Sequence, residues 1–122
     1  MPQQPFAPTR ASQKMTLNIT TETLTSHVSL FLEGEVDTTS APQLLQTLTE
    51  IGLAELAELR IHAMSLTFMS SAGLRALVYA KQKMPHSSRL IFVGGSADIQ
   101  EVITRTGLGN AVMLVETVDD IP

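Results

Sequence analysis

The chain has 122 residues, and 43% of them are hydrophobic, which is enough for one folded domain and excludes a disordered tail. Eight basic and twelve acidic residues give a net charge of -4 with no run of like charges, which argues against a nucleic-acid-binding protein. The absence of cysteine excludes disulfides and thiolate metal sites, and because no long apolar run or secretory signal is visible, we expect a cytoplasmic protein that contacts no membrane.

The first part of the chain divides into a polar arm and two strands. Residues 1–14 hold three of the six prolines and few apolar side chains, which predicts a flexible N-terminal arm ahead of a single domain over residues 15–122. Apolar and polar residues alternate over residues 15–19 and again over residues 27–35, which is typical of half-buried strands. We expect these two strands to pair antiparallel in a hairpin.

A helix follows the second strand. Ser40 and Gln43 have the spacing of a capping box, and Gly52 suits the left-handed position that ends a helix. Between them, five apolar residues recur at helical spacing and predict one buried stripe: Ala41, Leu44, Leu45, Leu48 and Ile51.

The remaining elements alternate between strand and helix. The patterns predict strands over residues 57–61, 90–93 and 112–115, and helices over residues 71–84 and 96–107. This order predicts an α/β fold with a mixed sheet of four to five strands, an antiparallel pair at its N-terminal edge and three helices, with a possible fourth at the end of the chain. The loops after the second and third strands fall at the same end of such a sheet, where ligands and partners usually dock.

Two adjacent serines open the second predicted helix. Ser70 and Ser71 follow the apolar run of the third strand, at the end of a helix where free backbone N–H groups collect. A hydroxyl there serves as a cap, and a phosphate there would be accommodated by the same groups. Spacing alone favours a capping role for these serines over a phosphorylation site.

Two segments carry a resemblance to a known family. Gly34-Glu35-Val36-Asp37, and Leu66-Thr67-Phe68-Met69-Ser70-Ser71-Ala72-Gly73-Leu74 after the third strand, resemble the anti-sigma factor antagonist branch of the STAS family, and the likeness runs over about residues 15–118. It implies a STAS-like domain that is a regulatory binding module, with no catalytic residues, cofactor or metal.

The resemblance also implies partners and a switch. In the family, the antagonist binds an anti-sigma factor that is also a serine/threonine kinase. The kinase phosphorylates the serine that opens the second helix, and a PP2C-type phosphatase reverses the modification. Matched by position, that serine is Ser71, with Ser70 as the alternative. The implied partner-binding residues are Asp37, Thr38, Ser70, Ser71, Ala72, Gly73 and Arg75.

Two positions depart from the family pattern. The family often has aspartate where this chain has Ser70, and an acidic residue near the end of the third strand where this chain has His62. We expect His62, Asp37 and Ser71 to project from the same end of the sheet. Those three residue types also form hydrolase triads, although no Gly-x-Ser-x-Gly elbow surrounds Ser71.

Three functions therefore remain in view. The first is the phosphorylated antagonist. The second is a STAS subunit of a transport system or sensory scaffold that is never phosphorylated, and the third, a remote one, is a small serine hydrolase.

Overall fold

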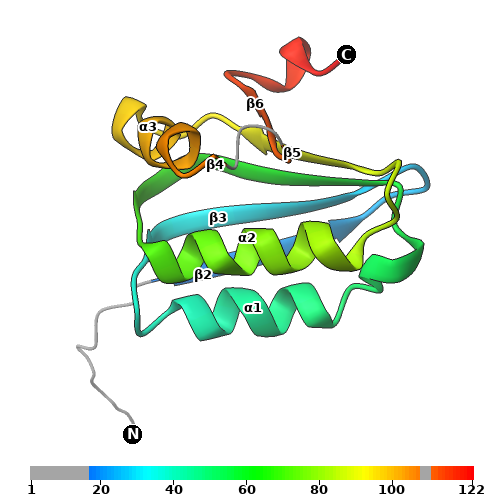
Figure 1. The fold of residues 1–122 in the computed structure, drawn as a ribbon, viewed down its shortest axis with the longest axis horizontal. Helices are drawn as coiled ribbons and strands as arrows, with labels where there is room; N and C mark the ends of the chain where they lie inside the picture. The colour runs from blue at the N-terminus through cyan, green and yellow to red at the C-terminus, as the bar shows by residue number, and fades with distance from the viewer. Residues whose placement is uncertain (1–16, 108–110) are drawn as a thin grey trace, which may run out of the picture.

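The computed structural model describes residues 17–107 and 111–122, so the predicted arm over residues 1–14 lies outside the described residues. One five-stranded sheet forms the centre of the structure, in the order β2-β3-β4-β5-β6 (Figure 1). Among the described strands, only the β2–β3 pair is antiparallel. The predicted α/β fold with an N-terminal antiparallel pair is thus confirmed. The strands are β2 (Leu17–Thr23), β3 (Val28–Val36), β4 (Glu58–Met69), β5 (Arg89–Val93) and β6 (Met113–Val115).

Three α-helices connect the parallel strands: α1 (Ala41–Thr49), α2 (Ser71–Lys83) and α3 (Ala97–Arg105). In residues 17–107 and 111–122, two short 3-10 turns accompany them, η1 (Leu53–Glu55) and η3 (Val118–Asp120). The prediction of three helices is confirmed, and the possible fourth helix at the end of the chain is the single turn η3.

The helices cover one face of the sheet. Strands β3 to β6 lie across the sheet in the order of the sequence. Right-handed crossovers between such strands place every connecting helix on the same face of the sheet. The buried side chains accordingly form one core that joins the sheet to all three helices, with Leu30, Ile61, Leu77, Phe92 and Ile103 among its members. Figure 1 shows α1 and α2 lying side by side along the sheet. The strand residues that alternate with these core residues point to the other face of the sheet, where Phe31 and Met64 are exposed.

Helix α1 departs from the prediction in two ways. Ala41, Leu44 and Leu48 are buried as expected, but Leu45 is 38% exposed at the edge of the stripe. The predicted capping box at Ser40 is wrong, because Ser40 already has helical backbone angles (φ -102, ψ -16) and its side chain makes no cap hydrogen bond. The Nε2 of Gln43 donates instead to the Leu17 carbonyl, at 3.3 Å, and ties α1 to β2.

Candidate partner-binding site

Strands β3 and β4 end beside each other, and each passes directly into a turn that leads to a helix. Val36 is paired with Met69 at the ends of the two strands. The Ser70 N–H donates to the Val36 carbonyl at 2.7 Å, which fixes the start of α2 against the end of β3. The Asp37 turn and the first turn of α2 are therefore neighbours, as expected of loops at one end of a sheet.

Asp37 organises the turn between β3 and α1. Its Oδ1 accepts hydrogen bonds from the backbone N–H groups of Thr39 and Ser40, both at 2.9 Å, and from the Thr39 hydroxyl at 2.7 Å. These bonds, led by the one from the Thr39 hydroxyl, hold the pKa of the Asp37 carboxyl below its usual range. Bonds to the second and third N–H groups after it resemble those of a helix cap, and through them Asp37 holds the turn that leads into α1.

Ser40 has a different task, which sequence reasoning missed. It is 3% exposed, and its Oγ accepts from the Asp37 N–H at 2.9 Å while lying 2.8 Å from the Glu35 carbonyl, to which it can donate. The sequence does contain a signal for this role, the run Asp37-Thr38-Thr39-Ser40. Aspartate, threonine and serine side chains often hydrogen-bond to nearby backbone groups in turns. The turn is held from within by its own side chains.

The two serines at the start of α2 have distinct surroundings. Ser70 is the N-cap, with extended backbone angles (φ -85, ψ 171) and an Oγ that accepts from the Gly73 N–H at 3.3 Å. Ser71 is the first helical residue, and its side chain is exposed. Within the part of the chain that the structure describes, the Ser71 hydroxyl makes no hydrogen bond. The cap is therefore Ser70, and Ser71 presents a free hydroxyl to the surface.

A negative group on Ser71 would meet a favourable field. The first turn of a helix carries unpaired N–H groups and the positive end of the helix dipole. Arg75 is exposed and lies four residues further along α2, on the same side of the helix as Ser71. The start of α2 can thus accommodate a phosphate without being unfolded by it.

Gly73 lets the first turn of α2 approach the two strand ends. It is buried, and a Cβ added to it would lie 2.6 Å from Val36 Cγ1 and closer still to Met69 Sδ. Because no Cβ fits there, Gly73 shapes the surface from below and is not itself exposed to a partner.

Two hollows flank the exposed side of α2, each with a volume of about 300 Å³. The first lies between α1 and α2, is mainly apolar, and includes Thr38, Leu45, Ala72, Arg75 and Tyr79 in its lining. The second lies between α2 and the end of α3, and includes Ser71, Arg75 and Thr106. Arg75 belongs to both. Four of the predicted binding residues, Thr38, Ser71, Ala72 and Arg75, therefore line one continuous uneven surface.

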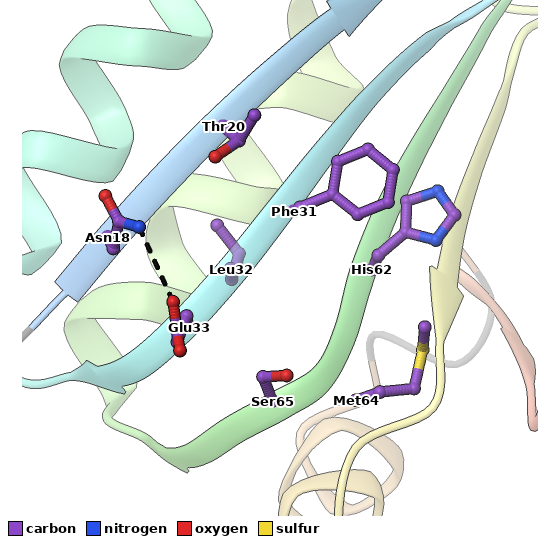
Figure 2. Close-up of a pocket in the computed structure, with 8 residues that line it drawn as sticks. All are labelled: Asn18, Thr20, Phe31, Leu32, Glu33, His62, Met64 and Ser65. Carbon is purple, nitrogen blue, oxygen red and sulfur yellow. Dashed lines mark hydrogen bonds between the residues drawn. The ribbon is translucent and has the colours of Figure 1, made fainter.

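His62 lies elsewhere, which corrects two expectations. It stands in the first half of β4, on the face of the sheet without helices (Figure 2). Seven residues of strand, 63–69, separate it from the turn into α2, about 23 Å at 3.3 Å per residue. The expectation that it occupies the end of the third strand is wrong, since β4 continues to Met69 beside β3. A Ser–His–Asp group does not form.

The surroundings of His62 are structural. Its ring stacks on Phe31 with centroids 4.3 Å apart and planes 15° apart, and its Nε2 lies 3.2 Å from Ser29 Oγ. Only 6% of His62 is exposed, and this burial, helped by the positive charge of Arg60, lowers the pKa of the imidazole. His62 is therefore a neutral side chain that packs the outer face of the sheet.

Among residues 17–107 and 111–122, no group of three histidine, aspartate or glutamate side chains is placed to hold a metal ion. None of the helices in the same residues has the length and apolar character needed to cross a membrane.

Comparisons with known proteins agree with this geometry. The model of the STAS domain family matches residues 18–121. The anti-sigma-B factor antagonist of Listeria monocytogenes is 30% identical over 89 residues, which are 72% of this chain and 78% of that protein. Among solved structures, an anti-sigma factor antagonist from Mycobacterium paratuberculosis superposes with a TM-score of 0.77 at 24% identity, over 85% of this chain and 89% of the other.

The fold is also that of the Bacillus cell fate determinant SpoIIAA in its phosphorylated form, with a TM-score of 0.65 at 23% identity, over 84% of this chain and 95% of the other. At such identities, the structural matches show the fold alone. The match of the family model over most of the chain and the identity to the Listeria relative show more: the chain belongs to the STAS domain family, in the group of the anti-sigma factor antagonists.

Proposed function

We propose that this chain is a cytoplasmic regulatory protein, not an enzyme, that binds an anti-sigma factor and so frees a sigma factor. The relatives support this proposal, because the Listeria protein is named an antagonist of anti-sigma-B factor. The observation that carries it is the exposed, unbonded hydroxyl of Ser71 on the ridge between two hollows.

The binding surface consists of Thr38, Ser71, Ala72 and Arg75 together with the apolar groove between α1 and α2. Aromatic and aliphatic groups such as Tyr79 and Leu45 supply the apolar area that a partner can cover. Asp37, Ser70 and Gly73 belong to the site in another way. They fix the turn, cap the helix and bring α2 close to the strands, so that the surface keeps its shape.

The partner is an anti-sigma factor with serine/threonine kinase activity, and Ser71 is its phosphorylation site. Ser71 is favoured over Ser70 because the Ser70 hydroxyl is half-buried and engaged as the cap. SpoIIAA, which shares the fold, is known in both phosphorylated and unphosphorylated forms. A PP2C-type phosphatase returns Ser71 to the hydroxyl form.

Phosphorylation acts on the interface and leaves the fold intact. A phosphate adds roughly 1.5 to 2 negative charges in the middle of the binding surface. The N-terminus of α2 and Arg75 stabilise that charge when it faces water. In the complex, the same charge would have to be desolvated or would face acidic groups of the kinase, so the partner is released.

Phosphorylation mapping tests the site. The wild-type chain, Ser71→Ala and Ser70→Ala are incubated with the cognate kinase, captured from the source cells by pull-down, and with ATP. We expect one phosphate on the wild type and on Ser70→Ala, and none on Ser71→Ala. If captured partners are transporter or scaffold subunits and no phosphate is added, the unphosphorylated scaffold is the correct function.

A further inference from the structure

Basic side chains gather at the end of the molecule opposite Ser71. Lys81 lies in the last turn of α2, ten residues after Ser71, about 15 Å along the helix axis at 1.5 Å per residue. His86 follows in the loop after α2, and Arg89 opens β5 beside Glu58 of β4. Figure 1 shows α2 running along the sheet, with its two ends at opposite sides of the molecule.

These side chains border a hollow of about 430 Å³. It lies between the end of α2, the start of β5 and residues 111–113, and Lys81, His86, Ser88 and Arg89 supply its polar groups. A second hollow of about 630 Å³ adjoins it and shares Lys81, His86 and Ala111. None of the described residues that line either hollow carries a carboxylate. These volumes are within the range of small-molecule sites, and the ionisable side chains in the lining are all basic.

Lys81 contributes one positive charge to the hollow. Its Nζ lies 3.2 Å from the carbonyl oxygen and 3.4 Å from the Oγ of Ser88, which positions the ammonium group at the wall. An ammonium group has three protons, so one remains for a further acceptor. No carboxylate of the described residues lies within ion-pair distance of Lys81.

Arg89 contributes hydrogen-bond donors to the hollow. Glu58 accepts from both Arg60 and Arg89, and although burial opposes ionisation, these two partners lower the pKa of its carboxyl. One side-chain carboxylate is thus shared by two guanidinium groups. Arg89 uses Nε and Nη2 for Glu58, and Nη2 also reaches the Pro122 carbonyl, so Nη1 is left to face an added acceptor.

We propose that this hollow is a binding site for a small anion of the phosphate type, held between Lys81, Arg89 and His86. The Lys81 ammonium group attracts an anion, no carboxylate lies in the described lining to repel it, and the preset positions of Lys81 and Arg89 reduce the entropy cost of binding. The site goes beyond the proposed function, because it lies at the far end of α2 and uses none of the residues around Ser71.

Inorganic phosphate is the probe for the test. The full chain, labelled with ¹⁵N, is titrated with sodium phosphate at pH 7.5, and a parallel titration with sodium chloride matches the ionic strength. We expect saturable amide shifts confined to residues 81–89 and 111–113 with phosphate, and none with chloride. Linear shifts, equal shifts with both salts, or shifts centred on the start of α2 would each overturn the proposal.

Two variants identify the charge responsible. Lys81→Gln should weaken phosphate binding about five- to tenfold, the effect of one charged hydrogen bond. Lys83→Gln is the matched control, since Lys83 is exposed two residues further along the same helix, with its Nζ near the Tyr79 ring and outside both hollows. Its affinity should equal that of the wild type. Equal weakening by the two variants would contradict a defined site. If Lys81→Gln is poorly folded, His86→Gln, at an exposed loop position, replaces it in the same comparison.

Discussion

Replacing Gly73 by alanine should destabilise the protein even though alanine is the better helix former. A Cβ at this position would lie 2.6 Å from Val36 Cγ1, whereas carbon atoms in contact prefer roughly 3.5 to 4.0 Å. Met69, on the other side, is flexible, but it is 4% exposed and has little room to turn. Val36 is fully buried and stiff at χ1. The overpacking costs about 1–3 kcal/mol, and the gain in helix propensity offsets at most about 1 kcal/mol of that.

From the middle of that range the net loss is about 1–2 kcal/mol, and a larger side chain, as in Gly73→Val, should cost more. In a chain of this size each kcal/mol lowers the melting temperature by about 3–5 °C. Thermal unfolding followed by circular dichroism measures the change, with Ser71→Ala as the control in the same helical turn. Adding Val36→Ala to Gly73→Ala should cost less than the sum of the two single changes, because it makes room for the Cβ. A melting temperature for Gly73→Ala equal to or above that of the wild type would refute the close-packing argument.

Three further predictions follow from the site and from the outer face of the sheet. Ser70→Ala should lower stability by about 1 kcal/mol, the usual effect of losing a cap, whereas Ser71→Ala should not, as denaturant titration can establish. Asp37→Ala should lower the melting temperature and Asp37→Asn should restore most of it, because asparagine can still accept the turn hydrogen bonds; equal losses would assign the effect to charge alone. Because burial keeps His62 neutral in the folded chain, the unfolded chain takes up its proton at higher pH, so stability should fall as pH drops below about 6.5. His62→Gln should flatten this dependence, and an unchanged slope would show that another group titrates.

The sequence predicted the order of the elements because most of them bury only one face. Val28, Leu30 and Leu32 alternate along β3, and all three are buried in the core. Ile99 and Ile103 are one turn apart in α3, and Ser96 caps that helix by accepting from the Ile99 N–H at 3.2 Å. In such segments the local pattern of apolar residues agrees with the tertiary packing, so the pattern alone predicts the element.

The length of β4 could not be read from alternation. The pairing of β3 with β4 has register shifts between Phe31 and Glu33 and between Gly34 and Glu35. Each shift breaks the period of two, so the pattern is lost after Ile61 although pairing continues to Met69. The position of His62 was wrong for this reason.

The capping box predicted at Ser40 was wrong because cap chemistry is shared by several neighbours. Asp37 and Ser40 are both good capping residues, and their roles depend on where the backbone becomes helical. The same holds for Ser70 and Ser71. Spacing placed both serines at the start of α2, but only the extended backbone of Ser70 identifies it as the cap and leaves the Ser71 hydroxyl free.

The affinity of the cognate anti-sigma factor for the unmodified and the Ser71-phosphorylated chain tests the central claim most directly. Isothermal titration calorimetry should show tight binding of the unmodified chain and of Ser71→Ala. Binding by Ser71→Asp should be weaker, and the phosphorylated chain should bind weakest, by about tenfold or more relative to the unmodified one, because the added charge lies within the interface. Circular dichroism of all four forms should coincide. Equal affinity of the unmodified and phosphorylated chains would contradict the account.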